Sequence, residues 1–115
     1  MCKYIIKGNK RLEGDIYIGG AKNSVLPILA STILNRGISV LYNCPDLRDV
    51  RVTIKILESL GCKITFIDSI ITVDSSQLIS CNVSAGYAKE LRSSIIFLGP
   101  LLSRCGEVSI AYPGE

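Results

Sequence analysis

The sequence GGAKNSVLPILA, residues 19–30, decides how this chain folds. Its two glycines interrupt the preceding pattern, and a strongly apolar segment from Asn23 to Asn35 follows them. The apolar residues of that segment cover nearly the whole helical wheel, which is typical of a helix that is buried on most sides. Pro27 is compatible with the helix because it falls in the first turn, where a missing N–H costs little. We therefore predict a first helix that packs among several other elements.

The sequence outside this helix alternates predicted strands with predicted helices, so we expect an α/β (α+β) fold. The second helix keeps its apolar residues on one face, begins at an N-cap, Pro45-Asp46, and ends at Gly61. Gly99-Pro100 should kink or locally loosen the third helix. The other predicted elements are strands at 3–8, 12–18 and 38–42, a hairpin of strands at 63–67 and 70–73, an irregular stretch at 75–86 with a short strand near 78–79, a helix at 87–104 and a strand at 107–112.

The chain also contains an internal repeat. A shift by 69 places lays the third predicted helix on the first, and each helix leads through a glycine into a strand. The matched residues include Ser24 with Ser93, Leu29 with Leu98, and Gly37 with Gly106. We therefore expect a first repeat at about 12–80 and an incomplete second repeat at about 81–115.

Composition excludes several classes of protein. The 115 residues are 48% hydrophobic and 20% charged, the opposite of a disordered chain. The first eleven residues carry a charge of +4 and the rest of the chain a net charge of −1, with no further basic block, which argues against nucleic-acid binding. No apolar run reaches the ~18–20 residues of a membrane span, and the first residues lack a signal peptide. A cytoplasmic protein that contacts neither nucleic acid nor membrane is expected.

The five cysteines are widely spaced and contain no CxxC pair, and the chain has no histidine. A zinc site normally needs close cysteine or histidine pairs, so we expect no metal. In a cytoplasmic protein all five cysteines are expected to be reduced and half-buried. No cofactor is predicted.

Three residues are candidates for binding an anionic ligand. Lys22 and Asn23 open the first helix after the glycine turn, where backbone N–H groups and an ammonium form a cradle for phosphate or carboxylate. The alternative is an ordinary turn with a solvated lysine and an asparagine N-cap. Arg92 lies in an otherwise apolar helix, where a charge is costly unless it is paired or faces an opening. Arg92 either lies at the exposed end of the helix with its aliphatic stem along the surface, or it faces the same cleft as Asn23, because the 69-residue shift matches the two positions.

Five stretches carry a resemblance to a known family, in order along the whole chain. They are GGAKNSVLPILA (19–30), NCPDLRDV (43–50), LESLGCKI (57–64), LRSSI (91–95) and LGPLLSR (98–104). These stretches resemble the enolpyruvyl transferases that act on UDP-N-acetylglucosamine. The resemblance implies an inside-out α/β barrel of two domains, each built from three ββαβαβ-type repeats whose apolar helices are buried under sheets. Complete members are roughly four times as long, so the chain resembles part of one domain, and strand 1–11 would pack with a second domain.

The resemblance also implies a reaction and its residues. The family transfers the enolpyruvyl group of phosphoenolpyruvate to the 3′-hydroxyl of UDP-N-acetylglucosamine, the committed step of peptidoglycan synthesis. Lys22 and Asn23 match residues that bind phosphoenolpyruvate, and Arg92 matches one that contacts the UDP-sugar. The general acid, a cysteine or aspartate after a Pro-Gly-Gly turn, is expected just after Glu115, so no catalytic residue lies within the chain. The chain alone is therefore expected to be inactive.

Two other interpretations stay open. The chain is a non-catalytic α/β binding or assembly module, or it belongs to a related enolpyruvyl transferase with another acceptor such as shikimate 3-phosphate. The latter enzymes usually carry Lys-Ser where this chain has Lys22-Asn23. On any of these interpretations the apolar helices need covering, so we expect the chain to self-associate through the faces of residues 25–33 and 95–102.

Overall fold

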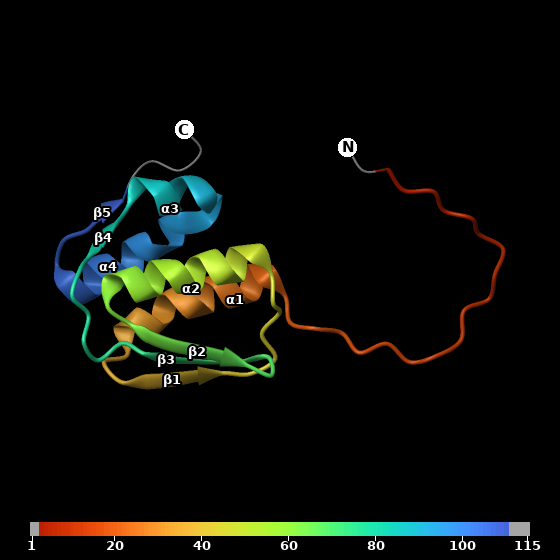
Figure 1. Cartoon of the computed structure of the whole chain (residues 1–115), viewed down its shortest axis with the longest axis horizontal. Coiled ribbons are helices and arrows are strands. Elements are labelled where there is room, and N and C mark those ends of the chain that lie inside the picture. Colours follow the sequence, from red (N-terminus) through yellow and green to blue (C-terminus); the bar gives the residue numbers. More distant parts are fainter. Residues whose placement is uncertain (1–2, 111–115) are drawn as a thin grey trace.

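A computed structural model describes residues 3–110, with all side chains in that range except those of Arg92 and Ser93 (Figure 1). Three antiparallel strands form the base of the fold: β1 (Ile38–Leu41), β2 (Lys63–Ile67) and β3 (Ile70–Asp74). Their order in the sheet is β1-β3-β2, so β3 pairs with both neighbours. Side chains of a strand alternate between its two faces, and in β3 Ile71 and Val73 are fully buried.

The hairpin of β2 and β3 confirms the sequence prediction. Asp68 and Ser69 connect the two strands with φ of 52° and 63°, and Ile67 pairs with Ile70 across the turn. Two consecutive residues with positive φ give a turn whose twist matches that of the flanking strands. Aspartate tolerates this conformation better than most residues, which explains its place here.

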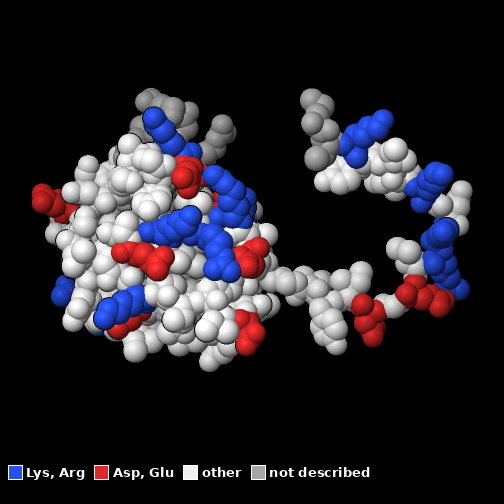
Figure 2. Space-filling model, viewed as in Figure 1, with Lys and Arg blue, Asp and Glu red and all other residues white. Residues whose placement is uncertain are grey.

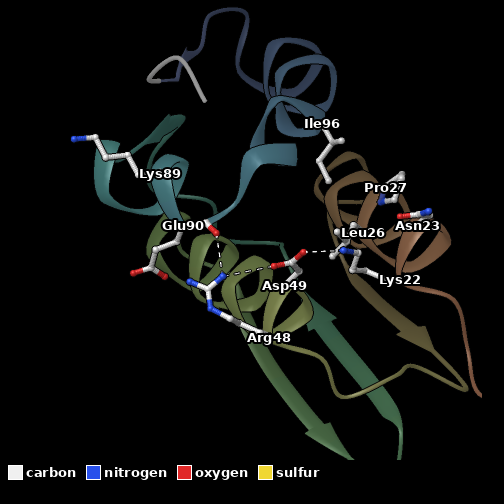
Figure 3. A pocket seen from close by; sticks show the side chains of 9 residues that line it. All are labelled: Lys22, Asn23, Leu26, Pro27, Arg48, Asp49, Lys89, Glu90 and Ile96. Carbon is white, nitrogen blue, oxygen red and sulfur yellow. Dashed lines mark hydrogen bonds and ion pairs between the residues drawn. The ribbon is translucent and has the colours of Figure 1, made fainter. Parts of the chain in front are cut away.

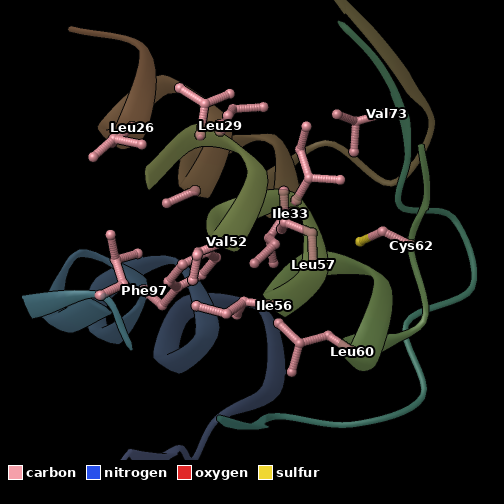
Figure 4. Close-up of a cluster of buried hydrophobic side chains, with 14 of the residues drawn as sticks. Leu26, Leu29, Ile33, Val52, Ile56, Leu57, Leu60, Cys62, Val73 and Phe97 are labelled. Carbon is pink, nitrogen blue, oxygen red and sulfur yellow. The ribbon is translucent and has the colours of Figure 1, made fainter. Parts of the chain in front are cut away.

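Two helices cover one face of the sheet (Figure 1). They are α1 (Lys22–Ser31), which continues as the 3₁₀ turn η1 (Thr32–Leu34), and α2 (Arg48–Leu60). Their apolar faces meet each other and the sheet, and Phe97 enters the same cluster from the far side (Figure 4). The largest fully buried side chains are Phe97, Leu29, Ile33, Ile56, Leu57, Leu60, Ile71, Leu91 and Leu101. This cluster holds the first turns of α1 and α2 in fixed positions.

Helix α2 ends as predicted but does not begin as predicted. Gly61 closes it in the left-handed conformation with φ of 114°. The helix begins at Arg48 after an extended Leu47, so the prediction of an N-cap at Asp46 is wrong. The Asp46 carboxylate instead accepts hydrogen bonds from Arg51 Nε at 2.7 Å and Nη2 at 2.8 Å. This bidentate contact holds the pKa of Asp46 below its ordinary value.

The predicted third helix, residues 87–104, is divided into two helical pieces. The first is α3 (Ala85–Glu90), and the second is the 3₁₀ helix η2 (Arg92–Phe97), which runs directly into α4 (Leu98–Cys105). The break falls at Leu91, which is extended and buried, and not at Gly99-Pro100 as expected. Gly99 and Pro100 lie in the first turn of α4, where proline is tolerated because the missing N–H has no partner within the helix.

The N-terminal segment differs from its prediction. Residues 3–21 form no strand in the part of the chain that the structure describes, so the strands predicted at 3–8 and 12–18 are wrong there. Figure 1 shows this segment looping away from the folded body, where no other strand lies beside it. A β-strand needs a neighbouring strand to which its backbone can hydrogen-bond, and this segment has no such neighbour. Its apolar side chains are also left in solvent, as Tyr17 is at 99% exposure.

The helices are also less completely buried than the sequence predicts. In α1 and η1, Val25, Leu29 and Ile33 are buried, but Ile28 is 50% exposed and Leu34 is 54% exposed. In the third predicted helix the exposed apolar residues are Ile95 (49%), Leu98 (42%) and Leu102 (50%). Each helix therefore keeps one apolar stripe that no other described element covers. No helix in residues 3–110 is both long and apolar enough to cross a membrane.

The cysteines correct a further prediction. Cys81 and Cys105 form a disulfide, so the expectation of five reduced thiols is wrong for this pair, while Cys44 and Cys62 are free and buried. The residues around the pair also differ from prediction, since no strand forms at 78–79. Instead β4 (Asn82–Val83) pairs in parallel with β5 (Ser109–Ile110) at the left edge of Figure 1. Ala111 and Tyr112, the end of the predicted strand 107–112, lie outside the described residues.

Candidate functional site

A pocket of about 750 Å³ opens where α1 and α2 begin beside each other. Its lining comes from three helices and the middle of η2 (Figure 3). The lining residues are Lys22, Asn23, Leu26, Pro27, Arg48, Asp49, Lys89, Glu90 and Ile96. Two of the three predicted site residues thus lie in one pocket, and four charged residues join them.

Lys22 is the first residue of α1, and its ammonium is held by a carboxylate from the next helix. Its Nζ lies 3.1 Å from Oδ2 of Asp49, and the two side chains are 47% and 28% exposed. Asp49 lies in the first turn of α2, where the helix dipole favours a negative charge. This ion pair joins the starts of the two helices and directs the lysine ammonium toward the pocket (Figure 3).

Arg48 connects the second helix to the third. Its Nη1 donates a hydrogen bond to the backbone oxygen of Glu90 at 3.3 Å and lies 3.8 Å from Oδ1 of Asp49. Glu90 is the last residue of α3, so the guanidinium satisfies a carbonyl at a helix C-terminus, where a cation is favourable. Asp49 is therefore shared between a lysine of α1 and an arginine that anchors α3.

Asn23 lies beside Lys22 in the first turn of α1. The helix N-cap is Ala21, which has extended backbone, so the alternative that Asn23 acts as an N-cap is wrong. Its side chain lines the pocket and projects from the outer side of α1 (Figure 3). An amide at this place can both donate to and accept from a ligand.

Arg92 begins η2, two residues after Glu90. Its side chain lies outside the described part of the structure. The backbone places its Cα at the junction that Arg48 holds through Glu90, next to the buried Leu91.

The electrostatics of the pocket favour a multiply charged anion. Lys22, Arg48 and Lys89 contribute three positive charges, and Asp49 and Glu90 contribute two negative ones. The first turns of α1 and α2 add backbone N–H groups at their positive ends. Figure 2 shows basic and acidic side chains close together on one face of the folded body, and a second group of charged side chains on the N-terminal segment that extends away from it. The arrangement can bind phosphate and carboxylate groups, with an apolar wall from Leu26 and Ile96.

Sequence reasoning gave no role in the site to Arg48, Asp49, Lys89 or Glu90. Arg48 and Asp49 belong to the stretch NCPDLRDV, which carries part of the family resemblance, so that motif was the signal that could have found them. Lys89 and Glu90 had no signal, because the segment around them was predicted to be one continuous helix. Pro113, Gly114 and Glu115, the expected approach to the general acid, lie outside the described residues.

Comparison with known proteins shows which family the chain is similar to. A model of the EPSP synthase (3-phosphoshikimate 1-carboxyvinyltransferase) family matches residues 6–115. The chain is 46% identical over 114 residues to UDP-N-acetylglucosamine 1-carboxyvinyltransferase 2 of Caldanaerobacter subterraneus subsp. tengcongensis. It is 41% identical over 114 residues to UDP-N-acetylglucosamine 1-carboxyvinyltransferase of Geobacter metallireducens. Both matches cover 99% of this chain but 27% of the relative, so the chain spans about a quarter of the length of these proteins.

A solved structure shows the same fold. The enolpyruvyl transferase NikO from Streptomyces tendae matches 86% of this chain with a TM-score of 0.74 and 26% sequence identity. The match covers 23% of the NikO chain. The predicted fold class, an α/β portion of an enolpyruvyl transferase barrel, is confirmed.

Proposed function

Because this chain belongs to the EPSP synthase family, we propose that it forms the amino-terminal part of an enolpyruvyl transferase acting on UDP-N-acetylglucosamine. The choice of acceptor is supported by the names of the relatives at 46% and 41% identity. The structural observation that carries the proposal is the pocket in which Lys22 and Asn23 meet Arg48 and Asp49. Such a pocket suits phosphoenolpyruvate, which carries a phosphate ester and a carboxylate on the same carbon atom, C2.

The proposed reaction is an addition followed by an elimination. The 3′-hydroxyl oxygen of the sugar bonds to C2 of phosphoenolpyruvate while an acid protonates C3, and the hydroxyl proton passes to a base. Loss of a proton from C3 then expels inorganic phosphate and restores the double bond. Positive charge around the phosphate and carboxylate lowers the energy of both steps. No cofactor takes part, and the product enters bacterial peptidoglycan synthesis.

The residues of this chain supply part of that positive charge. We assign Lys22 and Asn23 to phosphoenolpyruvate, since both residues belong to the first turn of α1 and line the pocket. We assign Arg92 to the UDP-sugar, and its backbone position beside Glu90 supports that role. The general acid is proposed to follow Glu115. The 115-residue chain should then release no phosphate from phosphoenolpyruvate in the presence of UDP-N-acetylglucosamine, and such release would refute the assignment.

The test is substitution of Lys22 in the full-length protein that contains this chain. Lys22→Ala removes a charge-assisted contact worth roughly 1.5–3 kcal/mol, so kcat/KM for phosphoenolpyruvate should fall by about 10- to 150-fold. Lys22→Arg should rescue only part of the loss, because a planar guanidinium does not replace a compact ammonium. Lys55→Ala, on an exposed lysine of α2 outside the pocket lining, is the matched control. Unchanged kinetics for Lys22→Ala would leave the pocket without its proposed role.

The same assay separates the alternative functions. Phosphate release with shikimate 3-phosphate in place of UDP-N-acetylglucosamine would favour the other acceptor. No release with either would favour a non-catalytic module. We further propose that the protein acts in the cytoplasm, since its charged substrates do not cross membranes unaided. The division into repeats at about 12–80 and 81–115, and the packing of strand 1–11 with a second domain, belong to the same proposal.

The isolated chain is also proposed to self-associate. Ile28 on α1 and Ile95, Leu98 and Leu102 on η2 and α4 are each 42–50% exposed, and they need cover from other apolar surface. The net charge of +3 opposes association only weakly. Sedimentation of the purified chain at micromolar concentration should give a dimer or larger, whereas a monomer that binds no apolar dye would contradict this.

A further inference from the structure

The geometry points to a thiol-exchange site at a second pocket, where the Cys81–Cys105 disulfide reacts reversibly with a small anionic thiol. This pocket, of about 590 Å³, is lined by both cysteines together with Arg36, Arg104 and Glu107. It shares no lining residue with the pocket of Lys22 and is independent of the proposed transferase function.

The disulfide is accessible from the pocket. Cys81 and Cys105 are both half-buried, whereas the two free cysteines of the folded body are buried. Burial also raises the pKa of the Cys62 thiol to about 11, which keeps it protonated and unreactive. Reagents in solution therefore reach the bonded pair in preference to Cys62.

The charges of the pocket favour an anionic reagent. Arg36 is exposed at the rim, and Arg104 lies deeper, donating to the backbone oxygen of Ile33 at 2.7 Å. Glu107 is the one acidic residue in the lining, so two guanidinium groups outweigh one carboxylate. An attacking thiolate and the carboxylates of a small thiol are both negative, and a positive pocket raises their local concentration.

The bond joins two elements that are weakly held otherwise. Cys81 precedes β4 directly, and Cys105 ends α4 four residues before β5. These two strands are each two residues long and form a sheet by themselves. A pair of strands this short is marginally stable alone, so the covalent link is expected to decide whether β4 and β5 stay together.

The exchange balances as two successive displacements. The thiolate of one small thiol attacks a sulfur of the pair, forms a mixed disulfide and releases the other cysteine as a thiolate, which takes a proton from water. A second thiolate attacks the small-molecule sulfur of the mixed disulfide and releases the first cysteine. Two electrons pass from two small thiols to the protein disulfide, and the small thiols leave as their own disulfide. Disulfides that occur in reducing compartments are usually of this reversible kind.

The first test uses the 115-residue chain, with reduced glutathione as the probe. Alkylation followed by mass spectrometry should find residues 81 and 105 protected before treatment and alkylated after it, with a glutathione adduct on one of them in between. Hydrogen exchange of the backbone amides of residues 82–83 and 109–110 should speed up by about tenfold on reduction, while that of α2 stays unchanged. Oxidised glutathione should reverse both changes. Cys81→Ser should show the fast exchange without any reductant.

Three results would overturn the proposal. The first is that both thiols are free in the air-oxidised chain. The second is that glutathione does not reduce the disulfide until the whole chain unfolds. The third is that reduction does not change the hydrogen exchange of the backbone amides of β4 and β5. The role of the pocket has its own test in Arg36→Gln, with Lys55→Gln as the matched control. Arg36→Gln should slow reduction by glutathione about threefold and slow reduction by 2-mercaptoethanol less, because the glutathione thiolate carries additional carboxylate charge. Equal effects on both reagents, or none on either, would show that the pocket does not select an anionic thiol.

Discussion

Replacing Gly20 by alanine is expected to force apart the two segments that lead into α1 and α2. A Cβ at this position would overlap the backbone oxygen of Asn43 and lie 3.1 Å from Cδ of Pro45. The obstacle is backbone and not the end of a flexible side chain, so one segment has to move. Gly20 lies two residues before Lys22, and Pro45 lies three residues before Arg48. The movement should therefore lengthen the 3.1 Å contact between Lys22 Nζ and Asp49 Oδ2.

The size of the effect follows from three contributions to the free energy of unfolding. Overpacking against backbone costs about 1–3 kcal/mol. Loss of the half-exposed ion pair of Lys22 and Asp49 adds at most about 0.5 kcal/mol. Alanine restricts the unfolded chain more than glycine does, which offsets about 0.4–1 kcal/mol. The sum of these contributions spans about 0–3 kcal/mol, and its midpoint of about 1.5 kcal/mol corresponds to a fall in Tm of about 5–10 °C for a chain of this size.

Gly19→Ala is the matched control, because no atom lies within 4 Å of a Cβ built at the neighbouring glycine. Its unfolding free energy should stay within about 0.5 kcal/mol of the parent chain or rise slightly. Urea unfolding followed by far-ultraviolet circular dichroism measures both variants, and the NMR shift of the lysine side chain reports the ion pair. Equal stabilities for Gly19→Ala and Gly20→Ala would refute the argued contact with Asn43.

Three further predictions concern the C-cap of α2, the site and a buried thiol. Gly61 and Gly106 have φ of 114° and 82°, but only at Gly61 would a Cβ meet backbone, 2.7 Å from an oxygen of the loop after β3. In urea unfolding, Gly106→Ala should lower the free energy of unfolding by about 1–2 kcal/mol and Gly61→Ala should lower it by about 3 kcal/mol or more. Equal losses for the two variants would contradict the backbone contact at position 61. In the full-length protein, Asp49→Asn should lower kcat by about tenfold with a smaller effect on KM, because the Lys22 ammonium loses the carboxylate that positions it. A change in KM alone would contradict this prediction. Burial raises the pKa of Cys62 from 9.0 to about 11, so the fold keeps a proton that the unfolded chain loses. The contribution of the Cys62 thiol to the free energy of unfolding is complete below pH 9 and is lost as the pH rises toward 11. Over that range the unfolding free energy of the parent chain should fall by about 2–3 kcal/mol more than that of Cys62→Ala. Parallel profiles of unfolding free energy against pH would contradict the raised pKa.

Local patterns predicted the elements that depend on local chemistry. The amphipathic spacing of residues 48–60 and the glycine after it define α2 and its C-cap, because both need only neighbours along the chain. The hairpin at Asp68-Ser69 followed for the same reason. Predictions failed where side-chain pairing and core packing decide. The Asp46 carboxylate pairs with Arg51, five residues further along, and not with a helix N-terminus. The segment 87–104 breaks at Leu91, whose side chain is buried in the core.

By itself, the sequence of this protein determined its family and its α/β class, because these depend on motifs and on the periodicity of apolar residues. It also indicated Lys22 and Asn23, which both line the pocket where α1 and α2 begin. Only the tertiary structure decided that Asp49 holds Lys22 across 27 residues of sequence, and that Arg48 reaches Glu90 across 42. It alone paired Cys81 with Cys105. Such contacts depend on how packed helices bring distant residues within a few ångströms, and no local pattern along the chain encodes that distance.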